Sequence, residues 1–147
     1  MVIFQQSTWA EKNWSIADVM DAIEYVESHG KSNADIYPFH REDYHRNEDR
    51  KSRGIFGVTD WAQKELVRVG KLDKVYAFDG SNVEVEKDIA CNYLIHMMEL
   101  YRCKSDKPAD WVEAAGWYHA GDNKQERKIY RLKIRNALER AKTRNQL

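Results

Sequence analysis

The chain has few of the features that hold small extracellular domains together or anchor a protein to a membrane. Among its 147 residues are two cysteines, and its 24 basic and 24 acidic side chains cancel. Cys91 and Cys103 lie on one expected helix, separated by about 18 Å of rise, so both are expected to be free thiols. The charge balance favours no class of charged partner, and no apolar run is long enough to span a bilayer. These absences leave a chain of one domain's length that must be stabilised by its own core.

The first 14 residues also lack the pattern of an export signal. The range from Met1 to Trp14 shows no basic segment followed by an apolar one. We therefore expect synthesis in the cytoplasm without a signal peptide, and we interpret this range as an N-terminal extension. A role outside the cytoplasm would then need another route of delivery.

A carboxylate on the apolar face of the first expected helix is the most informative single feature. Ser15 is expected to cap a helix from Ile16 to Ser28, and the apolar residues of this helix recur at helical spacing: Ile16, Val19, Met20, Ile23 and Val26. Glu27 falls inside that stripe, one turn after Ile23. Burial there would favour the protonated acid, the form that a general acid needs. An equally compatible interpretation is a Glu at a helix end, turned to solvent or paired with a Lys or Arg.

Hydrophobic periodicity predicts a mainly α-helical fold in a single domain covering residues 1–147. The further expected helices run from Thr59 to Val69, from Asn82 to Arg102, from Asp106 to Gly121 and from Lys124 to Arg144. We expect Ser81 to begin a capping box for the second of these and Pro108 to lie in the first turn of the third. The helix from Asn82 carries the broadest apolar surface, which is typical of the central helix of a core.

Two stretches outside these helices, and the last helix itself, have a distinctive composition. Residues 31–53 form a long polar insert, and a loop of that length is usually functional or mobile. Residues 54–58 are apolar and bracketed by glycines, which predicts a turn or a buried strand-like piece. The C-terminal range 124–147 is strongly basic, with Tyr130, Ile134, Ala137, Leu138 and Ala141 expected to face inward. We interpret its charge as a solvated helix face rather than as a nucleic-acid interface.

Three segments carry unusual chemistry for their position. They are Glu27-Ser28, then Ser52-Arg53-Gly54-Ile55-Phe56-Gly57, then Ala115-Gly116-Trp117-Tyr118-His119-Ala120-Gly121. In this order and at these spacings they resemble the motifs of the soluble lytic transglycosylases and goose-type lysozymes. That family carries Glu-Ser at a helix end, then Gly-Leu-Met-Gln, then Ala-Tyr-Asn-Ala-Gly. The resemblance extends from about Ile16 to Gly121.

The resemblance implies a lysozyme-like helical domain with a long central helix and a substrate cleft. Its members cleave the β-1,4 bond between N-acetylmuramic acid and N-acetylglucosamine in peptidoglycan. Glu27 would be the catalytic acid/base, and Tyr118 would reach this carboxyl group and hold its orientation. The substrate-binding residues implied by the motifs are Ser28, Gly54, Ile55, Phe56, Gly57, Trp117, Tyr118 and His119.

Two positions depart from the family pattern. Gly57 stands where the family usually has Gln, and His119 stands where it usually has Asn. These departures put the contacts to substrate in doubt, more than the identity of the acid. They also leave open an alternative function: a non-catalytic peptidoglycan-binding or structural component of a phage or secretion assembly with the same fold.

The chemistry fits a single carboxylate, because a transglycosylase uses the C6 hydroxyl of its own substrate as nucleophile and gives a 1,6-anhydro sugar. A hydrolytic glycosidase would need a second acid. Spacing does not choose among the candidates for it in the insert, which are Asp35, Asp43, Glu48 and Asp49.

No cofactor and no metal site are expected. The five histidines, His29, His40, His45, His96 and His119, show no recognised zinc spacing, and His96 is expected to be a satisfied core residue. The expected partner is the glycan strand of the bacterial cell wall. By analogy, delivery by a phage particle or lysis system is favoured over a secretion apparatus.

Overall fold

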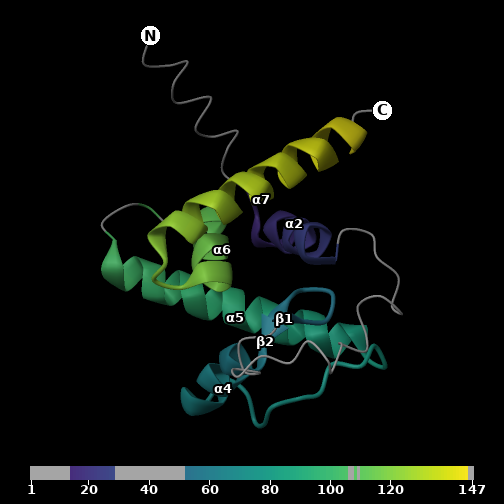
Figure 1. Ribbon diagram of the computed structural model, residues 1–147, viewed down its shortest axis with the longest axis vertical. Helices are drawn as coiled ribbons and strands as arrows, with labels where there is room; N and C mark the ends of the chain where they lie inside the picture. The colour runs from purple at the N-terminus through teal and green to yellow at the C-terminus, as the bar shows by residue number, and fades with distance from the viewer. Residues whose placement is uncertain (1–13, 29–51, 106–107, 109, 146–147) are drawn as a thin grey trace. The chain divides into compact units, whose positions relative to one another are not determined.

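The computed structural model describes residues 14–28, 52–105, 108 and 110–145, and in these ranges the fold is mainly helical (Figure 1). The helices are α2 (Ile16–Ser28), α4 (Asp60–Arg68), α5 (Val83–Lys104), α6 (Trp111–Ala120) and α7 (Lys124–Asn145). Two short strands, β1 (Ser52–Arg53) and β2 (Val58–Thr59), pair with each other. None of the described helices is long and apolar enough to cross a membrane.

The chain divides into two compact units. One contains Met1–Ala22 and Met97–Leu147, and the other contains Ile23–His96. Helices α2 and α5 each supply residues to both units, because each division falls inside one of these helices. The two units are described separately below.

In the unit Ile23–His96, the central element is an antiparallel hairpin followed by α4. Ser52 pairs with Thr59 and Arg53 pairs with Val58, so Gly54 to Gly57 form the turn. The segment predicted to be a turn or a strand-like piece is therefore a turn that continues into a strand. Thr59 ends the hairpin and caps α4, since its hydroxyl accepts a hydrogen bond from the Ala62 N–H at 3.0 Å.

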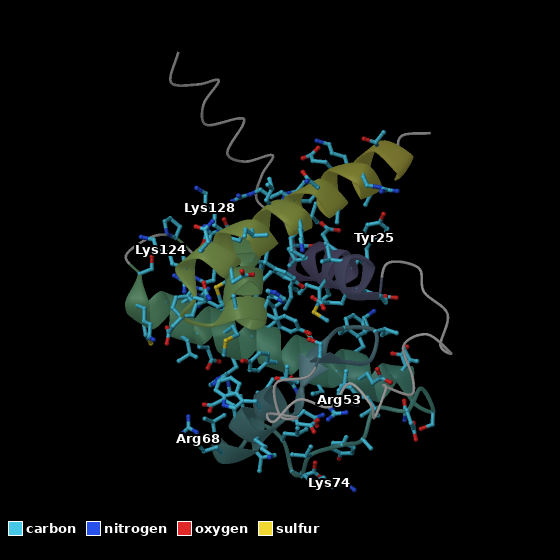
Figure 2. All side chains as sticks on the ribbon, in the orientation of Figure 1. Tyr25, Arg53, Arg68, Lys74, Lys124 and Lys128 are labelled. Carbon is cyan, nitrogen blue, oxygen red and sulfur yellow. The ribbon has the colours of Figure 1, made fainter. Side chains whose placement is uncertain are left out.

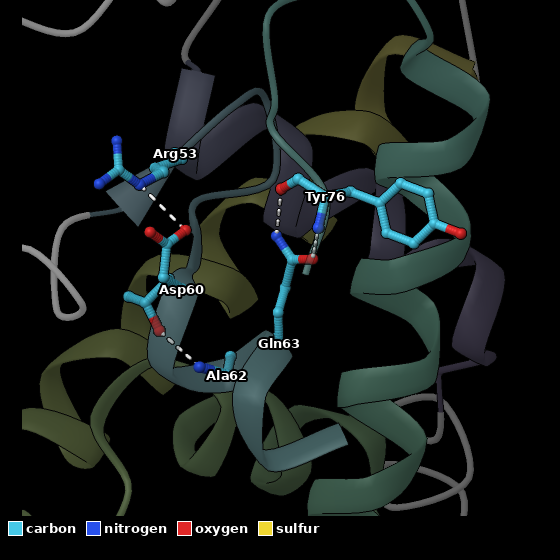
Figure 3. A network of polar contacts seen from close by, with 6 residues as sticks. Arg53, Asp60, Ala62, Gln63 and Tyr76 are labelled. Carbon is cyan, nitrogen blue, oxygen red and sulfur yellow. Dashed lines mark hydrogen bonds and ion pairs between the residues drawn. The ribbon is translucent and has the colours of Figure 1, made fainter. Parts of the chain in front are cut away.

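A buried glutamine fastens the loop after α4 to that helix (Figure 3). The Gln63 side chain is 0% exposed, its amide nitrogen donates to the Tyr76 carbonyl at 3.0 Å, and its amide oxygen accepts from the Tyr76 N–H at 2.7 Å. One side chain thus satisfies both backbone groups of a loop residue.

We expect Gln63→Leu to lower the free energy of unfolding by about 2–4 kcal/mol, because it leaves the Tyr76 carbonyl and N–H without partners beside an apolar side chain. Urea unfolding measures the loss. Gln125→Leu, at an exposed position of α7, is the matched control and should change stability by less than about 0.5 kcal/mol. Equal effects of the two substitutions would contradict a special role for Gln63.

The other unit is built on α6 and α7, which pack against each other. Asp110 caps α6 by accepting a hydrogen bond from the Val112 N–H at 2.8 Å, so the helix begins at Trp111. The expected start near Pro108 is therefore wrong. On α7, Tyr130, Ile134, Ala137 and Leu138 are buried as predicted, but Ala141 is exposed because the buried face of this helix ends before its last turn.

Helix α5 carries the expected broad apolar surface. Its buried apolar residues are Ile89, Ala90, Tyr93, Leu94, Met97, Met98 and Tyr101. The cap differs from the prediction. Ser81 donates its N–H to the Asp79 carboxylate at 2.9 Å, and Asn82 accepts from the Val85 N–H at 3.2 Å, so Asn82 caps the helix in place of Ser81.

Candidate active site

Glu27 lies in the last turn of α2, within the unit Ile23–His96. Ser15 caps the start of this helix as predicted, accepting from the Asp18 N–H at 3.1 Å, and Val19, Met20 and Ile23 on its apolar face are buried. Glu27 itself is half-buried. The residue is thus neither fully buried in the apolar face nor fully exposed at the helix end, the two positions that the periodicity allowed.

The Glu27 side chain packs directly onto Gly57. A Cβ placed on Gly57 would lie 2.6 Å from Glu27 Cδ, 2.9 Å from Cγ and closer still to Oε1. The backbone of Gly57 also has φ +61°, in the left-handed region that side chains rarely adopt. A glycine is therefore required here for two reasons, and the departure from the family's Gln coincides with the space that the Glu27 carboxyl group fills.

The opposite end of the same turn holds a second carboxyl group. Gly54, with φ +74°, has Glu86 Oε1 in the space that its own side chain would take, with Glu86 Cδ 3.3 Å and Phe78 Cδ2 3.0 Å from the Cβ position. Glu86 is 2% exposed and comes from the first turn of α5. The N–H of Gly57 donates to the Gly54 carbonyl at 3.3 Å, which closes the turn between the two glycines.

An ion pair borders the turn on its strand side. Arg53 is buried, and its Nε lies 3.1 Å from Asp60 Oδ1 (Figure 3). Asp60 is the first residue of α4, where the helix dipole favours a negative charge. This pair connects the strand that enters the turn to the helix that follows it.

Several other predicted site residues of this unit have structural contacts. Ser28 is buried, and its hydroxyl donates to the Glu24 carbonyl at 2.6 Å, within its own helix. Phe56 is 1% exposed and belongs to the core. Gly54 and Ile55 are half-buried, so within this turn they, with Gly57, remain accessible in part. The predicted groove floor therefore depends on the backbone of the turn and on Ile55, because the Phe56 ring faces inward.

In the other unit, the predicted site residue Trp117 lies among cations. The Arg127 guanidinium carbon is 4.2 Å from the indole centroid and Lys104 Nζ is 5.2 Å from it. Arg127 also donates to the Gly121 carbonyl at 2.7 Å, which fixes its position over the ring. Trp117 is half-buried, and these contacts are cation–π interactions from α5 and α7 that the motif alone did not indicate.

The remaining residues of the third motif face α7 or the interior. Tyr118 is buried, and the His119 ring stacks on Tyr130 with centroids 4.1 Å apart and planes 4° from parallel. Desolvation lowers the pKa of His119, Lys133 lowers it further, and Glu126 acts in the opposite direction. His119 is therefore neutral near pH 7, with one ring face covered. Tyr118 belongs to the unit that does not contain Glu27, so their predicted contact stays a prediction.

His96 is buried as predicted but is not satisfied by hydrogen bonds. Neither ring nitrogen has a hydrogen-bond partner, and Nε2 lies 3.6 Å from Glu65 Oε1. Glu65 also pairs with Arg68, and this bond is the main reason why the pKa of Glu65 is lowered. Burial raises the pKa of the nearby Tyr93 phenol, so it stays protonated. The cluster is a structural ion-pair group on α4 and α5.

Sequence reasoning missed Glu86. The signal was present, since Glu86 lies one turn before Ala90 on the apolar surface of α5, as Glu27 follows Ile23 on α2. The insert acids Asp35, Asp43, Glu48 and Asp49 lie outside the described residues. Within the ranges that the structure describes, no group of three or more His, Cys, Asp or Glu side chains has the geometry to hold a metal ion.

Both cysteines are free thiols, as predicted, and burial raises the pKa of Cys91. Comparison of the chain with protein-family models, with curated proteins and with solved structures gives no match. The functional argument therefore depends on the motifs and on the geometry around Glu27.

Proposed function

We propose that the protein is a peptidoglycan-cleaving muramidase of the lytic transglycosylase type, with Glu27 as its general acid and base. One observation carries the proposal: the Glu27 carboxyl group lies against Gly57 of the Gly-Ile-Phe-Gly turn. The first two motifs of the resemblance are 27 residues apart in sequence, from Glu27 to Gly54, yet they are in contact. A chance likeness of two short motifs gives no reason for such a contact.

The environment of Glu27 suits an acid that is protonated before the reaction. The side chain is half-buried, which disfavours the charged form. It also lies at the carboxyl end of α2, where the helix dipole is negative. Both effects favour the proton that general-acid catalysis requires.

The proposed reaction has two proton transfers and one bond exchange. Glu27 donates its proton to the glycosidic oxygen as the bond from that oxygen to C1 of N-acetylmuramic acid breaks. The ionised Glu27 then accepts the proton of the C6 hydroxyl of the same sugar, and that oxygen bonds to C1. The products are a free 4-hydroxyl group and a 1,6-anhydro end, and Glu27 is again protonated. The internal nucleophile benefits from a high effective concentration.

Mass spectrometry of purified sacculi incubated with the protein tests this proposal. Soluble muropeptides with 1,6-anhydro ends are the expected products. Reducing ends would indicate hydrolysis and a second acid. Binding to sacculi without any soluble product would favour the alternative, a non-catalytic wall-binding component of a larger assembly. Release of no product and no retention on sacculi would contradict both functions.

A further inference from the structure

One exposed side of α7 carries a straight row of cations. At about 100° per residue, four basic side chains of this helix fall within about 40° of one another, and all four are exposed: Lys124, Lys128, Arg135 and Lys142. From Lys124 to Lys142 the helix rises by about 27 Å. Lys124 and Lys128 point outward from the same side of the helix (Figure 2). The row is therefore a long line of positive charge open to a partner.

The acidic residues around this row do not cancel its charge. Of the two acids in α7, Glu139 lies on the same side as the row and Glu126 lies on the opposite flank. The acids of α6 and of the turn before α7 pair with cations outside the four: Glu113 with Arg131 at 3.3 Å, and Asp122 with Lys104 at 3.5 Å. Four cations against the single carboxylate of Glu139 leave an excess of positive charge along this side of the helix.

An exposed leucine borders the row at its centre. Leu132 is 59% exposed, and it lies four positions after Lys128 and three before Arg135, so it is a surface neighbour of both. Phosphate groups alone offer this side chain no apolar contact. The boundary between lipid headgroups and acyl chains offers both an anionic layer for the cations and an apolar layer for the leucine. The combination therefore favours a lipid surface over a nucleic acid.

We propose that this side of α7 docks on a bilayer surface that contains anionic lipid. A planar layer of headgroups contacts a straight row of cations along its whole length, and each Lys or Arg near such a surface strengthens binding by about fivefold. Leu132 enters the layer beneath the headgroups. The inference goes beyond the proposed cleavage of peptidoglycan and is tested without that substrate, so the two stand or fall separately.

Cosedimentation of the whole protein with lipid vesicles tests the docking. Vesicles of equal parts phosphatidylglycerol and phosphatidylcholine should bind the protein, and vesicles of phosphatidylcholine alone should not. Because exposed charges are screened by ions, binding to the anionic vesicles should weaken as the salt concentration rises. Equal binding to the two kinds of vesicle, or binding to neither, would overturn the proposal.

Lys128→Glu and Lys133→Glu form a matched pair for the position of the surface. Both lysines are exposed on α7 and both substitutions change the net charge equally, but Lys133 lies about 140° away from Lys128 around the helix. Lys128→Glu should weaken binding to the anionic vesicles by about 25-fold, and Lys133→Glu by less than about threefold. Equal losses in the two variants would show that only net charge matters and would contradict docking through this row.

Leu132→Gln separates a lipid surface from a nucleic acid, because it removes the apolar contact and keeps every charge. It should weaken vesicle binding by about tenfold, whereas Ile129→Gln, at an exposed apolar position beside Lys133, should have little effect. Circular dichroism should show that all these surface variants fold like the wild type. Binding of duplex DNA as tight as that of the anionic vesicles, together with vesicle binding unchanged in Leu132→Gln, would identify a nucleic-acid surface and overturn the proposal.

Discussion

Glu27→Gln should reduce the release of muropeptides from purified sacculi by about 10²–10⁴-fold, the range that a general acid and base contributes. Glutamine has nearly the same shape as glutamic acid and can keep the packing against Gly57. It has no proton of suitable acidity to give to the glycosidic oxygen and accepts none from the C6 hydroxyl. The rate of soluble product release, measured at equal protein concentration, gives the effect.

Glu24→Gln is the matched control for this substitution. Glu24 lies one turn earlier on α2, is also half-buried, and undergoes the same exchange of a carboxyl group for an amide in the variant. We expect near wild-type cleavage from it, and circular dichroism and thermal unfolding should show that both variants fold alike. Wild-type cleavage by Glu27→Gln would end the assignment of Glu27 as the acid and, with it, the proposed mechanism.

The helices could be predicted wherever a single residue was placed to cap them. Ser15 and Thr59 each precede an amphipathic run and each caps its helix, and Ser15 does so as predicted. At the start of α5, Ser81 and Asn82 are both good caps, and local pattern does not choose between them. In the structure the Asn82 side chain accepts from the Val85 N–H, and the Ser81 N–H is bonded to Asp79, which leaves it unavailable for the reciprocal bond of a capping box. Such competition is decided by the path of the loop.

The site could be predicted in part, because the position of Glu27 follows from the period of one helix. The contact between Glu27 and Gly57 could not, since it joins a helix to a hairpin that begins 24 residues after that helix ends, from Ser28 to Ser52. For the same reason, the motif did not indicate that Phe56 faces the core. The same holds for Trp117, whose cationic neighbours Lys104 and Arg127 come from two other helices.

The sequence also predicted where the basic residues are concentrated, but not which of them have partners. The basic run predicted for the C-terminus lies on α7, where Lys124 and Lys128 project from the first turns of the helix (Figure 2). Two of its arginines have defined partners: Arg131 pairs with Glu113 at 3.3 Å, and Arg127 covers Trp117. Part of the positive charge therefore stabilises the packing of α6 on α7, which a count of basic residues does not indicate.

Gly57→Ala should lower the cleavage rate by about 10²-fold or more while costing only about 1–2 kcal/mol of stability. The stability cost is the strain of a side chain at φ +61°. The new Cβ would collide with Glu27 Cδ, at 2.6 Å, and with its Oε1, which are the far end of a flexible side chain. The fold can therefore accommodate the methyl group by turning the carboxyl group aside, and a displacement of about 1 Å is enough to reduce catalysis by this factor.

Gly70→Ala provides the control for backbone strain alone. Gly70 has φ +81°, and nothing lies within 4 Å of its Cβ position, so alanine there costs a similar stability without touching the site. We expect urea unfolding to show comparable losses for the two variants, and cleavage assays to show a loss only for Gly57→Ala. Gly57→Gln, which introduces the residue usual in the family, should also lower activity, because Glu27 needs the space that the new side chain would take. Full activity in Gly57→Ala would mean that the carboxyl group does not need its place beside the turn, and the geometric basis of the proposed function would be lost.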